Sequence, residues 1–105
     1  FRLELLNKGD EQVTLQFPTS QLYDFVVENE NREVMYKYSE GRMFTQALVE
    51  KVLNPKESLT FEDVWNYEDL PSGTYTVYGE IVVREVNGSP AFREQFLVEE
   101  KITIQ

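Results

Sequence analysis

The chain has 105 residues, 41% of them apolar, so it is long enough to bury one core and predicts one domain over residues 1–105. It contains no Cys and no His, which excludes disulfides, thiolate or imidazole metal sites and Ser-His-Asp machinery, so most routes to an enzyme are closed and we expect none. Nineteen Asp and Glu against ten Lys and Arg give a net charge of −9, and no apolar run approaches the about 18–20 residues that cross a bilayer, so we expect neither nucleic acid nor a membrane as partner.

The first part of the chain predicts four strands in two hairpins. Residues 2–7 carry three leucines, and residues 12–17 alternate with Val13, Leu15 and Phe17 on one face. The turn between them contains Gly9, so we expect these strands to pair as a hairpin or its sandwich equivalent. Two further alternating segments flank a polar turn and predict a second hairpin, over residues 22–28 and 33–39.

Residues 39–53 break this regular alternation. Gly41 and Arg42 precede the apolar pair Met43 and Phe44, and the spacing of apolar residues from 45 to 52 fits a one-turn helix or a short strand equally well. About nine extended residues span about 30 Å, which can carry the chain from one sheet to the other. We interpret this segment as the crossover, with Phe44 tucked under the rim and Met43 either exposed or buried.

The stretch from residue 70 to 86 predicts the central strand. Tyr75 and Val77 share one face of a ribbon with period 2, which follows a turn containing Asp69, Pro71 and Gly73. A polar turn, a Gly and then a Tyr two residues before a buried position is the spacing of the tyrosine corner of immunoglobulin-like domains. In that corner the Tyr hydroxyl bonds the backbone of the turn.

Three local signals modify the strands around this corner. Residues 58–65 alternate with Asp63 on the inward face, and a bulge there would bring Val64 into the core. Gly79 interrupts the central strand and predicts a bulge or close packing against a neighbour. The pair Asn87-Gly88 predicts a tight hairpin before a last strand over residues 91–105.

Together these elements predict an all-β fold, an immunoglobulin-like antiparallel β-sandwich of seven or eight strands with Greek-key connections. The loops at residues 18–21, 54–57 and 87–90 are expected to share one end of it. Charges on the last strand disfavour association through an open edge, so we expect a monomer; these are Glu94, Glu99 and Lys101.

Carboxylates and aromatic residues each have a structural and a functional interpretation. The carboxylate clusters lack the spacing of a calcium loop, so we expect solvated faces; they are Glu28/Glu30/Glu33, Glu62/Asp63, Glu68/Asp69 and Glu99/Glu100. The aromatic set could line a binding platform, but most members fall at core-facing positions, so core packing is favoured. This set comprises Tyr23, Tyr36, Tyr38, Trp65, Tyr67 and Tyr78, with Tyr67 and Tyr78 expected to be the more exposed.

The sequence Tyr23-Asp24-Phe25, followed by VMYKYSEGRMF over residues 34–44, resembles the Bacillus-type intracellular proteinase inhibitor family, BsuPI. The family pattern is a Tyr-Asp-Phe strand, a turn, an aromatic strand and then Ser-x-Gly-x-x-Phe. The corner at 70–75 and the strand at 59–65 are also similar, so the resemblance covers nearly the whole chain. Tyr36 stands where family members often have Trp.

The resemblance implies a cytoplasmic immunoglobulin-like sandwich without cofactor that inhibits an intracellular subtilisin-type serine protease; on physical grounds we expect it to bind through rigid loops at the rim of the sandwich. It assigns no reactive-site residues, so two mechanisms stay open. In one, a single extended loop enters the protease cleft like a substrate, with Met43 or Leu53 as the apolar anchor. In the other, the loops at 18–21, 54–57 and 87–90, each containing a Pro, wedge into the cleft together.

The candidate contact residues for these mechanisms are Gly41, Arg42, Met43, Pro55 and Gly88. The alternative function is that of a non-inhibitory bacterial β-sandwich module for interaction or assembly.

Overall fold

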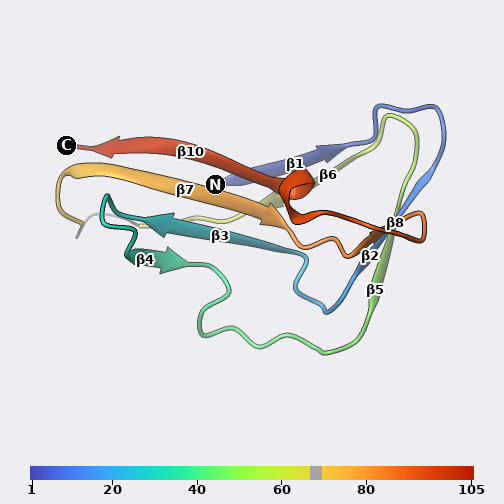
Figure 1. The fold of residues 1–105 in the computed structure, drawn as a ribbon, viewed down its shortest axis with the longest axis horizontal. Coiled ribbons are helices and arrows are strands. Elements are labelled where there is room, and N and C mark those ends of the chain that lie inside the picture. Colours follow the sequence, from blue (N-terminus) through green and yellow to red (C-terminus); the bar gives the residue numbers. More distant parts are fainter. Residues whose placement is uncertain (67–69) are drawn as a thin grey trace.

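The computed structural model describes residues 1–66 and 70–105, and this part of the chain is all-β (Figure 1). Residues 1–66 and 70–105 contain eight strands of four or more residues, two short strands and one 3₁₀ turn. The elements are β1 (Arg2–Leu6), β2 (Val13–Phe17), β3 (Tyr23–Glu28), β4 (Val34–Lys37), β5 (Val49–Leu53), β6 (Ser58–Glu62), β7 (Gly73–Ile81), β8 (Glu85–Val86), β9 (Ser89–Pro90), η1 (Arg93–Phe96) and β10 (Leu97–Ile104).

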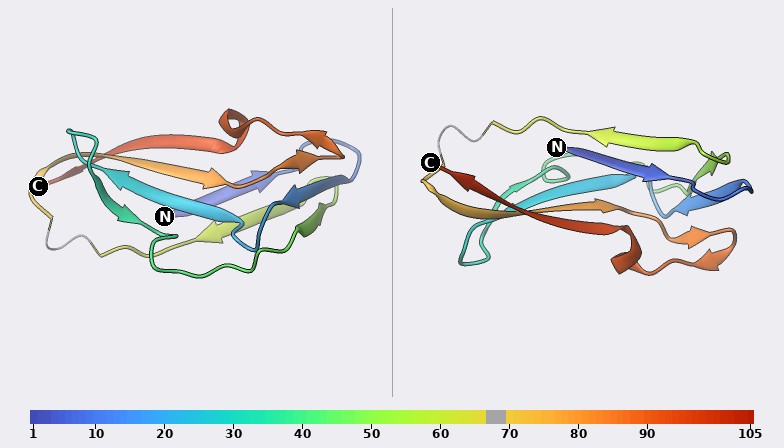
Figure 2. Two further views of the ribbon diagram at one scale, coloured as in Figure 1. Left: turned by 60° about the horizontal axis from the view of Figure 1, so that its bottom comes forward. Right: turned by 90° about the horizontal axis from the view of Figure 1, so that it is seen from above.

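The strands form three antiparallel sheets. One four-stranded sheet has the order β10-β7-β3-β4, a second has the order β5-β2-β8-β9, and β1 pairs with β6 alone. The edge-on view in Figure 2 shows β1 and β6 as a layer over β3, β7 and β10. Neighbours that are distant in sequence, such as β1–β6 and β3–β7, give the Greek-key type of connection predicted for the sandwich.

The core lies between these layers. Leu3 of β1 and Phe61 of β6 pack with Phe25 of β3 and Ile81 of β7, all nearly inaccessible to solvent. A second cluster toward the other end contains Val27, Tyr75 and Val77. Along β7 the buried residues alternate with half-buried ones, as one-sided burial of a sheet requires.

The corner before β7 has the predicted geometry. The Tyr75 hydroxyl donates a hydrogen bond to the Pro71 carbonyl oxygen at 2.6 Å, and Val77 is buried two residues later. This confirms the tyrosine corner and the immunoglobulin-like class of the sandwich. Asp69, which was included in the predicted corner, lies outside the described residues, as do Tyr67 and Glu68.

Gly79 allows β1 to approach β7 closely. A Cβ atom at Gly79 would lie 2.6 Å from Cδ2 of Leu3 and 3.3 Å from Cγ2 of Val98. The register of β7 against β3 and β10 continues through Gly79 without a shift, so close packing is correct and a bulge is not.

The predicted hairpin of residues 2–7 with residues 12–17 is wrong. β1 pairs with β6, and β2 pairs with β5 and β8. The buried Asn7 side chain explains the separation, since its Nδ2 donates to the carbonyl oxygens of Glu11 and Leu53 while its Oδ1 accepts from the Gly9 amide. These bonds turn the chain out of one sheet and into another.

The other connections match the predictions more closely. β3 and β4 form the expected hairpin, and the chain crosses from β4 to β5 over residues 38–48. Residues 49–53 are a strand, which decides between the two alternatives for this segment. The positive φ angles of Asn87 (51°) and Gly88 (81°) form the predicted tight turn between β8 and β9.

Two strand boundaries and the expected burial of one side chain differ from the predictions. The central strand ends at Ile81, because the Val83 amide bonds the Ile81 carbonyl and the chain then joins a different sheet. Val64 is 93% exposed rather than buried, since Asp63 keeps the inward position. The last strand begins at Leu97, after the 3₁₀ turn.

In the described part of the chain, no helix has the length and apolarity needed to span a membrane.

Candidate functional site

The five candidate contact residues lie in two separate places. The 41–44 loop, which follows β4 at the start of the crossover, contains the first group, Gly41, Arg42 and Met43. Pro55 and Gly88 lie at the far end of the sandwich, formed by residues 7–12, 54–57 and 86–89 (Figure 1). The structure therefore does not bring the five residues together.

The 41–44 loop presents one apolar side chain to solvent. Met43 is 99% exposed, the most exposed of the large apolar residues described. Gly41 has a φ of 78°, a left-handed conformation that a glycine adopts without strain. Phe44 is half-buried but is not among the apolar residues packed against the two core clusters, so its place under the rim stays a prediction, whereas Met43 takes the exposed alternative.

The N-terminal root of this loop is a hydrogen-bonded turn. The Glu40 amide donates to the Lys37 carbonyl at 3.1 Å, and the Arg42 amide donates to the Ser39 carbonyl at 3.2 Å. The Ser39 hydroxyl in turn donates to Oδ2 of Asp24 on β3 at 2.7 Å. The turn is thus attached to the sheet as well as closed on itself.

The Arg42 side chain folds back onto the strand that precedes the loop. Its guanidinium carbon lies 4.1 Å from the centre of the Tyr38 ring, and its Nε donates to the Tyr38 carbonyl at 2.8 Å. Tyr38 stacks on Tyr23 at 4.5 Å between ring centres, and Tyr23 stacks on Phe61 at 4.8 Å. This series of rings links the loop to the core and directs the charge of Arg42 away from the tip.

The C-terminal root of the loop is attached to residues 18–21. The Thr45 amide donates to Ser20 Oγ at 2.8 Å, and the Ser20 amide donates to the Thr45 carbonyl at 3.0 Å. The prediction that residues 18–21 share an end with 54–57 and 87–90 is therefore wrong. They follow β2 at the end opposite to its Val13 and support the crossover instead.

The far end of the sandwich is also braced by hydrogen bonds. The Lys56 amide donates to the Asn7 carbonyl at 2.8 Å, and the Asn87 side chain accepts a bond from the Thr14 amide at 2.9 Å. Pro55 and Gly88 are both exposed here. Leu53, the other residue considered as an apolar anchor, is only 5% exposed and packs inward from β5, so it cannot serve as one.

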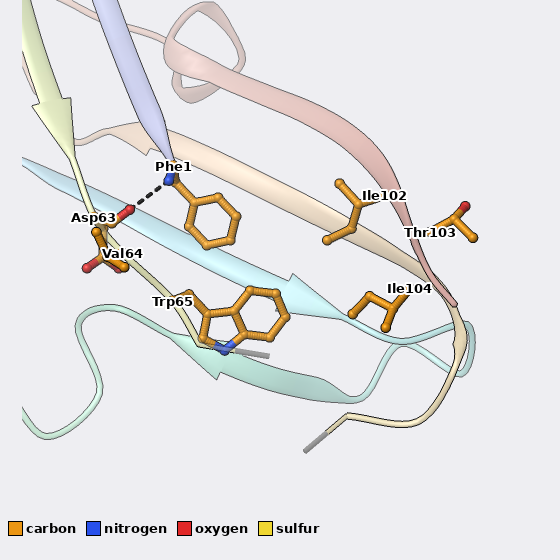
Figure 3. Close-up of a pocket in the computed structure, with 7 residues that line it drawn as sticks. All are labelled: Phe1, Asp63, Val64, Trp65, Ile102, Thr103 and Ile104. Carbon is orange, nitrogen blue, oxygen red and sulfur yellow. Dashed lines mark hydrogen bonds between the residues drawn. The ribbon is translucent and has the colours of Figure 1, made fainter. Parts of the chain in front are cut away.

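An apolar pocket of about 390 Å³ opens at the opposite end, beside the last strand (Figure 3). The rings of Phe1 and Trp65 face Ile102 and Ile104 across it. Phe1 also stacks on Trp65 at 5.7 Å, and Trp65 stacks on Tyr36 at the same distance. These contacts confirm core packing for Tyr36 and Trp65, as the stacks above do for Tyr23 and Tyr38. Tyr78, expected to be among the more exposed, is half-buried.

Among the described carboxylates of the predicted clusters, Glu28 and Asp63 are half-buried rather than fully exposed. Asp63 is half-buried, and its Oδ2 accepts a hydrogen bond from the Tyr36 hydroxyl. Burial, followed by this bond to the carboxylate, raises the pKa of Tyr36 to about 12. Within residues 1–66 and 70–105, no group of three His, Cys, Asp or Glu side chains is placed to hold a metal ion.

The facing sheets and the tyrosine corner define the class of this protein, an immunoglobulin-like β-sandwich. The model of the BsuPI family, described as intracellular proteinase inhibitor, matches residues 1–86, and the chain belongs to this family. The match includes both roots of the 41–44 loop and the tyrosine corner, and it ends before β9 and β10. A comparison with curated proteins gives no match.

Sequence reasoning missed the side chains that brace the loop. Asp24 was noted as part of the family pattern without a role, and Ser20 was assigned to a different surface. A signal for Asp24 was present, because an Asp between Tyr23 and Phe25 in a mostly apolar strand needs a hydrogen-bond partner if it is buried. No comparable signal marks Ser20, whose partner lies 25 residues away in sequence.

Proposed function

We propose that this chain inhibits an intracellular subtilisin-type serine protease by inserting the 41–44 loop into the substrate cleft, with Met43 as the anchor in an apolar pocket. The family to which the chain belongs supports inhibition of a protease. The shape of the loop supports the mode, in which a segment binds like a substrate but is held in one conformation.

The observation that carries the proposal is the contrast between the tip of the loop and its roots. Met43 is 99% exposed, while hydrogen bonds hold the turn before it and Thr45 after it. Exposing a large apolar side chain gains nothing for the isolated domain, whereas burial in a partner's pocket is favourable. A loop that is already ordered loses less conformational entropy on binding.

The position of Arg42 supports an apolar pocket over an acidic one. Its guanidinium lies on Tyr38 and its Nε is bonded to a carbonyl, so presenting it to a partner would break both contacts. Presenting Met43 to a partner would break no contact of this kind. Subtilisin-type proteases generally accept large apolar side chains in their principal pocket, which is the basis for proposing this protease class.

The test is a titration of a subtilisin-type protease with the domain, read as residual activity on a small chromogenic substrate. Stoichiometric loss of activity is expected for the wild type. Met43→Asp places a charge in an apolar pocket and should raise the inhibition constant by about 30-fold or more, the equivalent of losing a binding hot spot of about 2 kcal/mol. The matched control is Val64→Asp, because Val64 is 93% exposed on a different segment.

Equal effects of Met43→Asp and Val64→Asp would contradict the assignment of the loop. Loss of inhibition with Pro55→Gly but not with Met43→Asp would instead favour binding through the far end. Full protease activity at equimolar wild type, with the domain intact, would favour a non-inhibitory interaction module.

We also propose that the chain acts in the cytoplasm as a monomer built as one domain over residues 1–105. The family description as intracellular supports the location. Exposed Glu99, Glu100 and Lys101 on β10 support the monomer, because charges on an edge strand oppose pairing with a second copy.

A further inference from the structure

Asp24 is a buried carboxylate that the proposed binding mode does not yet use. It lies at the second position of β3, between Tyr23 and Phe25, and is only 7% exposed. The adjacent inward positions are filled by apolar side chains, so Asp24 projects from the opposite face of the same sheet.

A carboxylate is unfavourable at this place unless something compensates for it. Its cross-strand neighbour in the register of β3 and β7 is Glu80, which carries the same charge. Glu80 has its own partner in Arg93, at 2.9 Å from Nε to Oε1. No ion pair to Asp24 is found within the described residues, so hydrogen bonds must offset its burial.

The hydrogen bonds that Asp24 accepts come from the backbone of β3 and from the N-terminal root of the 41–44 loop. Oδ1 of Asp24 accepts from the Phe25 amide at 3.0 Å and from the Ser39 amide at 3.1 Å. Oδ2 accepts from the Ser39 hydroxyl at 2.7 Å. Two of the three bonds therefore go to one residue, located two positions before Gly41.

Ser39 also holds in place the residues that lie nearer the tip of the loop. Its carbonyl oxygen accepts the Arg42 amide at 3.2 Å, which fixes the left-handed turn at Gly41 and the direction in which Met43 leaves it. Asp24, Ser39 and Arg42 thus form a continuous chain of contacts from the central sheet to the residue before Met43.

We propose that Asp24 is a positioning residue, which holds the 41–44 loop in its binding conformation through Ser39; this rests on the proposed inhibitory function. An apolar side chain at this position would suit a buried strand but would leave the Ser39 amide and hydroxyl without their acceptor. The loop would then sample other conformations, and the protease could cleave it as an ordinary substrate.

The test compares variants of Ser39, which alter the contact without disturbing β3. Ser39→Ala removes the hydroxyl bond, and Ser39→Thr keeps it. Three quantities are measured for each purified full chain: the inhibition constant against a subtilisin-type protease, the Tm, and the hydrogen-exchange rate of the Arg42 amide in the free domain. Asp24→Ala is a second, stronger variant.

We expect Ser39→Ala to weaken inhibition and to speed exchange of the Arg42 amide, each by about 10-fold, the equivalent of one hydrogen bond to a charged group. Prolonged incubation with protease should then cleave the chain only within residues 40–45. Ser39→Thr should restore both quantities. The control Val77→Ala shortens a buried side chain on β7, so it should lower the Tm while leaving inhibition and the Arg42 amide unchanged.

The inference is overturned if Ser39→Ala leaves inhibition and exchange unchanged while Met43→Asp still weakens inhibition as expected. It is also overturned if the effects of Ser39→Ala follow the Tm, as those of a merely destabilised domain would. A wild-type chain that does not inhibit overturns the proposed function itself, and this inference with it.

Discussion

At the scale of single residues, the phenol groups of Tyr23 and Tyr36 report on how the sandwich is closed. Burial raises the pKa of Tyr36 to about 12, with a further contribution from its bond to Asp63. Burial and the neighbouring Tyr38 raise the pKa of Tyr23 to about 12 as well. Both groups connect β3 or β4 to residues 61–65, so they lie where the two layers meet.

These shifts predict a loss of stability in alkaline solution. An unfolded tyrosine ionises near pH 10, whereas these two keep their protons to about pH 12 when folded. The folded state therefore binds more protons between these values, and the stabilisation that is complete below pH 10 is lost as the pH rises toward 12. Thermal unfolding across this range should show a falling Tm, with a shallower fall for Tyr36→Phe. A titration of phenolate absorbance in which every phenol ionises together near pH 10 would contradict it.

Gly79 makes a prediction about packing at the same scale. The Cβ of Gly79→Ala would lie 2.6 Å from Cδ2 of Leu3, which is itself buried and cannot move aside freely. Overpacking of this kind costs about 1–3 kcal/mol, to be measured as the free energy of unfolding in urea. Gly9→Ala is the matched control, because its nearest contact is 3.4 Å, and it should change stability by less than about 0.5 kcal/mol. Equal stability of the two variants would show that β1 does not press on β7 at this point.

At the scale of elements, the crossover between β4 and β5 is an irregular segment held at both of its ends. Asp24 and Ser39 fix one end, and Ser20 and Thr45 fix the other. A connection that only linked two sheets would need neither attachment. The two roots therefore act on the segment between them, which carries Met43.

The second root predicts a specific effect on inhibition. Ser20→Ala removes the acceptor of the Thr45 amide in a solvent-exposed turn, so the Tm should change by only a few degrees. Inhibition of a subtilisin-type protease should weaken by about 3- to 10-fold, since the loop becomes less ordered before binding. Thr19→Ala serves as the control, because it removes a bond to the Gln21 amide in the same turn without touching the crossover. If both variants inhibit equally well, the second root plays no part in binding.

Local signals predicted several elements correctly. The β3–β4 hairpin, the tyrosine corner at Tyr75 and the tight turn at Asn87 and Gly88 each depend on residues close together in sequence. The pairing of β1 with β6 was missed, because alternation identifies a strand without identifying its partner. That choice is made by packing and by the side-chain bonds of Asn7, which join segments 46 residues apart.

The candidate site shows the same difference between local signals, which can be read from the sequence, and long-range contacts, which cannot. The 41–44 loop was recognised from its composition, and the structure places Met43 at its exposed tip. The separation of Pro55 and Gly88 from the loop, and the burial of Leu53, follow from the course of the chain in three dimensions and leave no mark in the sequence. Ser39, which bonds Asp24, lies 15 residues away in the turn after β4, so the role of Asp24 could be assigned only from the structure.

At the scale of the whole molecule, the domain is elongated, with extents of 46 × 29 × 21 Å, and the two surfaces proposed for binding are far apart along it. A single protease cleft can therefore contact only one of these two surfaces. Figure 2 shows the C-terminal end of β10 at the end of the molecule opposite to β8 and β9, and the apolar pocket is lined by Ile102 and Ile104 from that end of β10.

The most direct test of the account is amide hydrogen exchange of the domain, alone and in complex with a catalytically inactive subtilisin-type protease. The account predicts that the complex protects peptides covering residues 39–48 and leaves those covering 7–12, 54–57 and 86–89 unchanged. Protection of the far end, with residues 39–48 exchanging as in the free domain, would contradict it.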